Sequence, residues 1–209
     1  MTRNIAIYLY DEVEVLDFAG PFEVFCTAGR MAQRAFPRLP SPFNIFFVAA
    51  ENRMMRARGG MWVEPHYGFS DHPPINVLII PGGVVTAQLK KTAVIDWLSH
   101  TARQAELAAS VCTGAFLLAR TGLLDGLAAT THWEDARDLR TLFPAVTVRE
   151  EVRWVDNGSI LSAAGISAGL DLSLHLVEKL EGKDLALKTA RQMDYAWQDQ
   201  PEKEGNDAH

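Results

Sequence analysis

The chain has 209 residues, enough for one large α/β domain with its own hydrophobic core. Hydrophobic residues make up 48% and charged residues 22%, which excludes a disordered chain, and a net charge of −6 with dispersed acidic residues argues against nucleic-acid and membrane-surface binding. The longest uncharged stretch, residues 72–89, is broken by prolines and glycines, and the N-terminus has no signal-peptide core, so we expect a cytoplasmic protein without a membrane span.

Apolar, β-rich runs alternate with helical patterns along the chain, as in a mostly parallel α/β sandwich. The strands are predicted at residues 4–10, 43–49, 77–80, 107–111, 152–156 and 159–163. Helices are predicted from Pro21, which would stand in a first turn, and at residues 92–103, 112–119, 133–142, 167–181 and about 185–197.

Turn and helix-ending residues in the C-terminal half of the chain support these assignments. Asn157-Gly158 between two strands is typical of a hairpin, and Gly182 stands where a helix would end. We see no repeat or linker, so residues 1–198 are predicted to form a single domain, and the polar residues 199–209 are expected to fray.

In open parallel sheets, ligands bind beyond the carboxyl ends of the strands. Four predicted connections emerge at that edge, and they carry Asp17, Gly83, Cys112 and Ile166. These residues are therefore expected to converge on one site.

Cys112 lies in a strand–turn–helix sequence, SVCTG, that is typical of a nucleophile elbow. The field of the helix N-terminus predicts a lowered thiol pKa, and nearby amides, including those of Gly82 and Gly83, are candidates to hold a developing negative charge. The alternative is that Cys112 is a small buried apolar residue. Cys26, inside an apolar helical segment, is interpreted as structural, and both cysteines are expected to be free thiols.

Asp17 and His132 each allow two interpretations. Asp17 fits a helix N-cap as well as a catalytic acid. His132 stands before a helix downstream of the elbow, where it fits a hydrogen-bonded structural histidine or a site residue. The histidines lack zinc spacing, and there is no Walker loop or GxGxxG motif, so neither a metal nor a nucleotide cofactor is predicted.

Six motifs stand in order along the chain: LDFAGPFEVF (16–25), IPGG (80–83), SVCTGAFLL (110–118), TGLLDG (121–126), ATTHW (129–133) and SAAGISAGLD (162–171). With them the sequence resembles the ThiJ/PfpI superfamily, whose fold is class I glutamine amidotransferase-like, over most of residues 4–197. The resemblance implies a flavodoxin-like three-layer sandwich, a nucleophilic Cys112 with Asp17 as its acidic partner, and a homodimer with the site near the interface.

Within the superfamily, the chain is similar to isonitrile (isocyanide) hydratases and to the amidase-like domain of AraC-type regulators. The regulators continue into a helix-turn-helix domain, whereas this sequence stops soon after Trp197, which favours the enzyme branch. Thr113 stands where the peptidase branch has histidine, and Asp17 where the glyoxalase branch has glutamate. Ala19 departs from the hydratase pattern, which has threonine there.

We therefore expect a lyase that hydrates isocyanides to N-substituted formamides, with a thioimidate on Cys112 and Asp17 as general acid and base. The residues expected to position the substrate are Gly83, Thr113, Ile166 and His132. The expected partners are a small-molecule substrate and a second copy of the chain. The alternatives are a non-catalytic small-molecule or redox sensor and a glyoxalase-type dicarbonyl hydratase.

Overall fold

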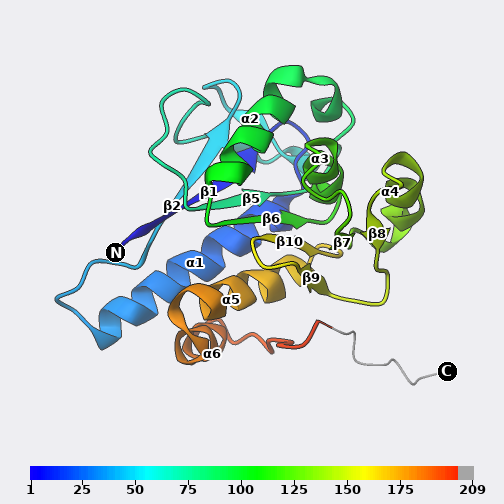
Figure 1. Ribbon diagram of the computed structural model, residues 1–209. Helices are drawn as coiled ribbons and strands as arrows, with labels where there is room; N and C mark the ends of the chain where they lie inside the picture. Colours follow the sequence, from blue (N-terminus) through cyan, green and yellow to red (C-terminus); the bar gives the residue numbers. More distant parts are fainter. Residues whose placement is uncertain (202–209) are drawn as a thin grey trace.

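The centre of the fold is a six-stranded sheet (Figure 1). The structure is a computed structural model that describes residues 1–201 of the chain. The strand order is β2-β1-β5-β6-β10-β9, and all neighbouring pairs are parallel except β10 and β9. The strands of this sheet are β1 (Arg3–Leu9), β2 (Phe43–Ala49), β5 (Val77–Ile80), β6 (Leu107–Val111), β9 (Trp154–Asp156) and β10 (Ile160–Ala163).

Helices cover both faces of this sheet. Two of them, α2 and α3, lie on one face, while α1, α5 and α6 pack together on the other (Figure 1). The predicted three-layer, flavodoxin-like α/β sandwich is thereby confirmed. The α-helices are α1 (Val15–Ala35), α2 (Thr92–Gln104), α3 (Gly114–Arg120), α4 (Ala136–Leu142), α5 (Ala168–Glu181) and α6 (Lys183–Gln192), and the 3₁₀ helices are η1 (Arg58–Gly60), η2 (Gln88–Lys90) and η3 (Trp133–Asp135).

The central strands are apolar because both of their faces are covered. Every residue of β5 and β6 is buried, which explains why these strands read as continuous apolar runs rather than alternating ones. The predicted bounds of β2, β5 and β6 coincide with the observed ones. The hairpin at Asn157-Gly158 and the helix end at Gly182, where φ is +93°, are also confirmed.

The first helix begins earlier than predicted. It starts at Val15, so Pro21 lies inside α1 rather than in its first turn. The side chain of Glu14 accepts a hydrogen bond from the Val15 amide and caps the helix, which means that Asp17 is not the N-cap. Asp17 instead lies in the first turn with its side chain buried, and it is therefore free of a capping role.

Three other predicted helices also differ from the structure. The helix predicted from residue 112 begins at Gly114, and the one predicted at 133–142 consists of η3 followed by α4. The last helix ends at Gln192 rather than near Trp197, because the chain takes a left-handed conformation at Asp194 (φ +51°).

Part of the predicted frayed tail is held in place. Asp199 forms an ion pair with Lys183 at 2.8 Å, and the Pro201 carbonyl accepts a hydrogen bond from the Arg153 amide at 2.6 Å. Fraying is therefore wrong for residues 199–201, while residues 202–209 lie outside the described part of the chain.

Four short strands were not predicted. They form two small two-stranded sheets, which are β3 (Met55–Arg56) with β4 (Trp62–Val63), and β7 (Ala128–Ala129) with β8 (Thr147–Val148). Runs of two residues carry too little periodicity to be read from a sequence. None of the helices within residues 1–201 has the length and apolarity needed to cross a bilayer.

Candidate active site

Cys112 occupies a sharp turn between β6 and α3. Its φ is +54°, a left-handed conformation that is uncommon for a residue with a side chain and that costs about 1–3 kcal/mol. The turn is tight because Gly114 packs against β5: a Cβ on Gly114 would lie 2.0 Å from the Ile80 carbonyl oxygen. The predicted strand–cysteine–helix elbow is therefore present.

Hydrogen bonds to the backbone hold Cys112 in this conformation. Its amide donates to the carbonyl oxygens of Ala163 (3.1 Å), the last residue of the neighbouring strand β10, and of Ala164 (2.9 Å), the residue after it. Its own carbonyl accepts a hydrogen bond from the Thr131 hydroxyl at 2.9 Å. The backbone at the thiol is thus fixed from two sides.

Asp17 faces the thiol of Cys112 from the first turn of α1. The carboxyl group is fully buried, and its Oδ2 accepts a hydrogen bond from the Gly82 amide at 3.0 Å. Burial raises the pKa of Asp17 to about 7, while the hydrogen bond from the Gly82 amide and the neighbouring Cys112 thiol lower it. Near neutral pH, Asp17 is therefore present both with and without its proton.

The predicted lowering of the Cys112 pKa is wrong. Burial and the negative charge of Asp17 raise the pKa of the thiol to about 12, although a hydrogen bond from the Thr113 amide acts in the opposite direction. The residue is buried, since only 7% of its surface is exposed. At neutral pH the sulfur consequently carries its proton, and Asp17 is the nearby group able to accept it.

The glycine turn after β5, residues 81–83, is bonded to the elbow. The Thr113 hydroxyl accepts a hydrogen bond from the Gly83 amide and donates one to the Gly83 carbonyl, both at 2.9 Å. A Cβ on Gly82 would lie 2.6 Å from the Thr113 nitrogen, so this contact requires glycine. The amides of Gly82, Gly83 and Cys112 therefore already donate within the protein, and the expectation that they are free for an oxyanion is wrong.

Ile166 and His132 line an open hollow of about 420 Å³ next to the elbow. The hollow borders the elbow at Ala164, whose carbonyl holds the Cys112 amide. His132 packs against the turn, since a Cβ on Gly165 would lie 3.2 Å from its Cδ2, and its Nδ1 is 3.5 Å from Asp135. The residues lining the hollow are Leu16, His132, Trp133, Arg153, Ala164, Gly165, Ile166, Ser167 and Ala168.

The structure thus places the predicted residues in two groups. Asp17, Gly83 and Thr113 lie with Cys112 at the elbow and the glycine turn, and Ile166 and His132 line the adjoining hollow. Both cysteines are free thiols, as predicted. Within residues 1–201, no three histidine, cysteine, aspartate or glutamate side chains are grouped as a metal site.

Sequence reasoning missed three residues of the site. Thr131 binds the Cys112 carbonyl, and the buried Tyr10 hydroxyl donates to the Pro81 carbonyl at 3.0 Å, below the glycine turn. Burial raises the pKa of Asp135, whose negative charge in turn raises that of Cys112. Thr131 lies in the ATTHW motif and could have been considered there, but no signal in the sequence points to Tyr10 or Asp135.

Comparison with known families and sequences gives a consistent result. A family model described as "DJ-1/PfpI family" matches residues 3–179. Isonitrile hydratase of Pseudomonas putida is 32% identical over 94% of this chain and 80% of its own length. The transcriptional regulator GbdR of Pseudomonas aeruginosa is 27% identical over 88% of this chain, which spans only 48% of that regulator.

Solved structures agree on the fold. A ThiJ/PfpI family protein from Pseudomonas syringae superposes with a TM-score of 0.81 at 25% identity, covering 100% of this chain and 80% of that one. DJ-1beta of Drosophila melanogaster superposes with a TM-score of 0.78, covering 94% of this chain and 100% of its own. At 18% identity, the second likeness concerns the fold alone.

Proposed function

The chain belongs to the DJ-1/PfpI family, and we propose that it hydrates isocyanides (isonitriles) to N-substituted formamides. The observation that carries the proposal is the pairing of a buried Asp17, with a pKa of about 7, with a thiol on a nucleophile elbow. The similarity to an isonitrile hydratase over most of the chain supports this choice of substrate class.

The first step joins the Cys112 sulfur to the terminal carbon of the isocyanide. As the sulfur–carbon bond forms, the thiol proton passes to the Asp17 carboxylate, and the same carboxyl group delivers a proton to that carbon. The carbon–nitrogen triple bond becomes a double bond. The product is a thioimidate, R–N=CH–S–Cys112, in which Asp17 has returned to its starting charge.

The second step adds water to the thioimidate carbon. Asp17 accepts a proton from the attacking water and delivers it to the imine nitrogen, which gives R–NH–CH(OH)–S–Cys112. The carbon–sulfur bond then breaks as the hydroxyl proton passes through Asp17 to the sulfur, and the formamide R–NH–CHO leaves. One water molecule is consumed, and no electron transfer takes place, so neither a metal nor an organic cofactor enters the proposal.

The pKa values of the two groups suit this division of roles. A thiol pKa of about 12 keeps the sulfur protonated until Asp17 removes the proton, so the attack depends on the carboxylate. An Asp17 pKa of about 7 allows the same group to act as base and then as acid near neutral pH. The Thr113 amide, which lowers the thiol pKa, stabilises negative charge on sulfur during the transfer.

The N-substituent of the isocyanide would lie in the hollow beside the thiol. Leu16, Trp133 and Ile166 give it apolar walls, which favours alkyl and aryl groups. His132 would contact the substituent at the rim. Thr113 and Gly83 would not contact the substrate. Their mutual hydrogen bonds would hold the elbow and the glycine turn together.

Family membership also leads us to propose a cytoplasmic homodimer with its two sites near the interface. The apolar residues at the hollow are the observation in support, since Leu16 is 39% and Trp133 71% exposed. A second copy that covers them would bury this surface and narrow the hollow. Sedimentation of the purified protein tests the dimer, and a monomer at micromolar concentration would contradict it.

The direct test incubates the purified protein with an alkyl and an aryl isocyanide and follows formamide formation. Wild-type protein is expected to turn over, Cys112→Ala to be inactive, and Cys26→Ala, the matched control for the other thiol, to keep its activity. Absence of turnover in the wild type, or wild-type turnover by Cys112→Ala, contradicts the proposal.

Two observations favour a second candidate, a non-catalytic small-molecule or redox sensor. The match to GbdR covers 88% of this chain, and a protonated thiol is compatible with reversible ligand binding. A stoichiometric increase in thermal stability with a metabolite, without turnover of isocyanides, would support this function. Conversion of methylglyoxal to lactate would instead support a glyoxalase-type dicarbonyl hydratase.

A further inference from the structure

Arg153 contacts both ends of the turn that lines the hollow. Its carbonyl oxygen accepts a hydrogen bond from the Ala164 amide at 2.8 Å, at the beginning of the turn. Its guanidinium group donates to the Ser167 hydroxyl at 3.3 Å, at the end of the turn. Only 17% of the Arg153 side chain is exposed, and it forms part of the wall of the hollow.

Asp171 forms an ion pair with the guanidinium group of Arg153. Its carboxyl group is fully buried in α5, and Oδ2 accepts a hydrogen bond from Arg153 Nε at 2.6 Å and a second contact from Nη2. Oδ1 accepts hydrogen bonds from the Tyr195 hydroxyl and the Gln198 amide, both at 3.0 Å. Both carboxylate oxygens are thus fully used, which fixes the position of the ion pair.

The C-terminal segment is tied to the same two residues. Trp197 Nε1 donates to the Asp171 carbonyl at 3.2 Å, and the Pro201 carbonyl accepts from the Arg153 amide at 2.6 Å. Residues 195–201 therefore pack against the ion pair. Arg153 has bonded neighbours on both sides and little freedom to move.

We propose that Arg153 and Asp171 are positioning residues of the site, whose ion pair holds the turn at residues 164–167 in place beside the elbow at Cys112. The turn carries the Ala164 carbonyl that binds the Cys112 amide, and it carries Ile166, which lines the hollow. The place of both groups relative to Cys112 therefore depends on the ion pair between Arg153 and Asp171.

The consequence is that the ion pair keeps the thiol shielded. When Arg153 loses its side-chain contacts, the turn is held only by its backbone hydrogen bonds, and it can move away from Cys112. The sulfur then becomes more accessible, and the burial that raises its pKa decreases. Loss of the ion pair should consequently increase the reactivity of Cys112 towards a general electrophile.

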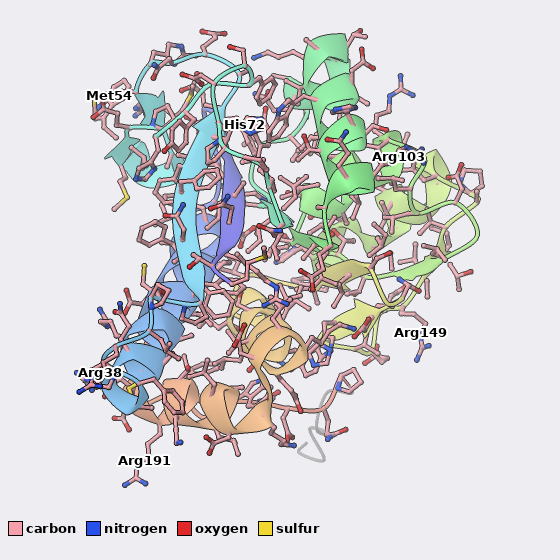
Figure 2. The ribbon with its side chains drawn as sticks, turned by 60° about the vertical axis from the view of Figure 1, so that its left-hand side comes forward. Arg38, Met54, His72, Arg103, Arg149 and Arg191 are labelled. Carbon is pink, nitrogen blue, oxygen red and sulfur yellow. The ribbon has the colours of Figure 1, made fainter. Side chains whose placement is uncertain are left out.

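The experiment measures alkylation of the two cysteines by iodoacetamide from pH 7 to pH 10, with mass spectrometry to separate the sites. Arg153→Met keeps the length of the side chain and removes its charge, whereas Arg153→Lys keeps the charge but lacks the fork that reaches Asp171 and Ser167 together. Arg149→Met is the matched control, because Arg149 is exposed and its side chain points away from the molecule (Figure 2).

In Arg153→Met, we expect Cys112 to react about fivefold faster at pH 8, with the midpoint of its pH profile shifted downward, because the thiolate is the reacting species. Arg153→Lys should lie between this variant and the wild type, and Arg149→Met should match the wild type. Cys26 reports on the rest of the fold, since the charges acting on it are those of Glu23 and Arg30. Its rate should stay constant in all variants.

Two results would overturn the proposal. An unchanged Cys112 rate and pH profile in Arg153→Met would show that the ion pair does not shield the thiol. Equal acceleration of Cys26 and Cys112 would show that Arg153 stabilises the whole fold rather than the turn. Because the readout is alkylation, the test holds whatever the natural substrate is.

Discussion

The carboxyl group of Asp17 and the thiol of Cys112 face each other in a buried space, but no hydrogen bond of standard geometry joins them. Asp17 Oδ2 is bound to the Gly82 amide, while Oδ1 has no hydrogen-bond partner within the described residues. The thiol nevertheless lowers the pKa of Asp17, and the charge of Asp17 raises the pKa of the thiol. One carboxylate oxygen is thus available to take and give a proton beside the sulfur.

Replacing Asp17 with asparagine should abolish proton transfer while keeping the Gly82 hydrogen bond, because the amide oxygen still accepts it. We expect kcat for isocyanide hydration to fall by about 10²–10⁴, with a smaller change in KM. Steady-state kinetics measure both constants. A variant with a wild-type kcat would exclude Asp17 as the proton carrier.

The same substitution should change how stability depends on pH. Folding raises the pKa of Asp17 from 3.8 to about 7, so its contribution to stability is complete below pH 3.8 and is lost as the pH rises through 7. Ionised Asp17 therefore destabilises the folded protein at alkaline pH by roughly 4 kcal/mol.

Asp17→Asn carries no such charge. Its free energy of unfolding should exceed that of the wild type by an amount that grows from pH 5 to pH 8. Urea denaturation at several pH values measures this difference, in which other titrating groups cancel. A difference that does not vary with pH would show that the Asp17 pKa is ordinary.

Thr113→Val should disturb the glycine turn. Valine has the shape of threonine but lacks the hydroxyl, so the Gly83 amide and carbonyl lose their partner. We expect a loss of about 1–3 kcal/mol in the free energy of unfolding. Thr113→Ser, which keeps the hydroxyl, is the control and should stay close to the wild type. Equal stability of the valine and serine variants would contradict this role.

Gly114→Ala should be among the most damaging single changes at the elbow. The added Cβ would lie 2.0 Å from the Ile80 carbonyl oxygen, which is backbone and cannot rotate away. We expect a loss of more than about 3 kcal/mol or a protein that does not fold. Gly126→Ala is the comparison: its φ is +77° but no atom lies within 4 Å, so about 1–2 kcal/mol is expected. Thermal denaturation ranks the two variants.

The parts of the fold that follow from local pattern were predictable. The bounds of β5 and β6 are set by apolar runs with clear ends, in β5 the Pro81-Gly82-Gly83 turn. The start of α1 was not predictable. A proline in a helix normally stands in the first turn, so the sequence placed the start near Pro21, whereas the helix begins at Val15. A glutamate N-cap is uncommon, so Glu14 gave no competing signal.

The members of the site were predictable, but their chemical state was not. Chain order and sheet topology bring Asp17 and Cys112 together, since both follow parallel strands. The thiol pKa depends instead on how much protein covers the sulfur, and burial there exceeds the effect of the Thr113 amide. The same applies to the amides of Gly83 and Cys112, whose partners Thr113 and Ala164 are known only after packing.

The strand order has a consequence for the way the protein is made. The groups around the sulfur follow β1, β5, β6 and β10, four successive neighbours in the sheet, so the site forms only when the last of them has paired. Synthesis proceeds from the N-terminus, and Cys112 leaves the ribosome well before Ala163. Until β10 docks, the Cys112 amide lacks its partners Ala163 and Ala164, and the elbow is not yet held in place. The nascent chain therefore carries the cysteine for some time before the backbone that fixes it has been made.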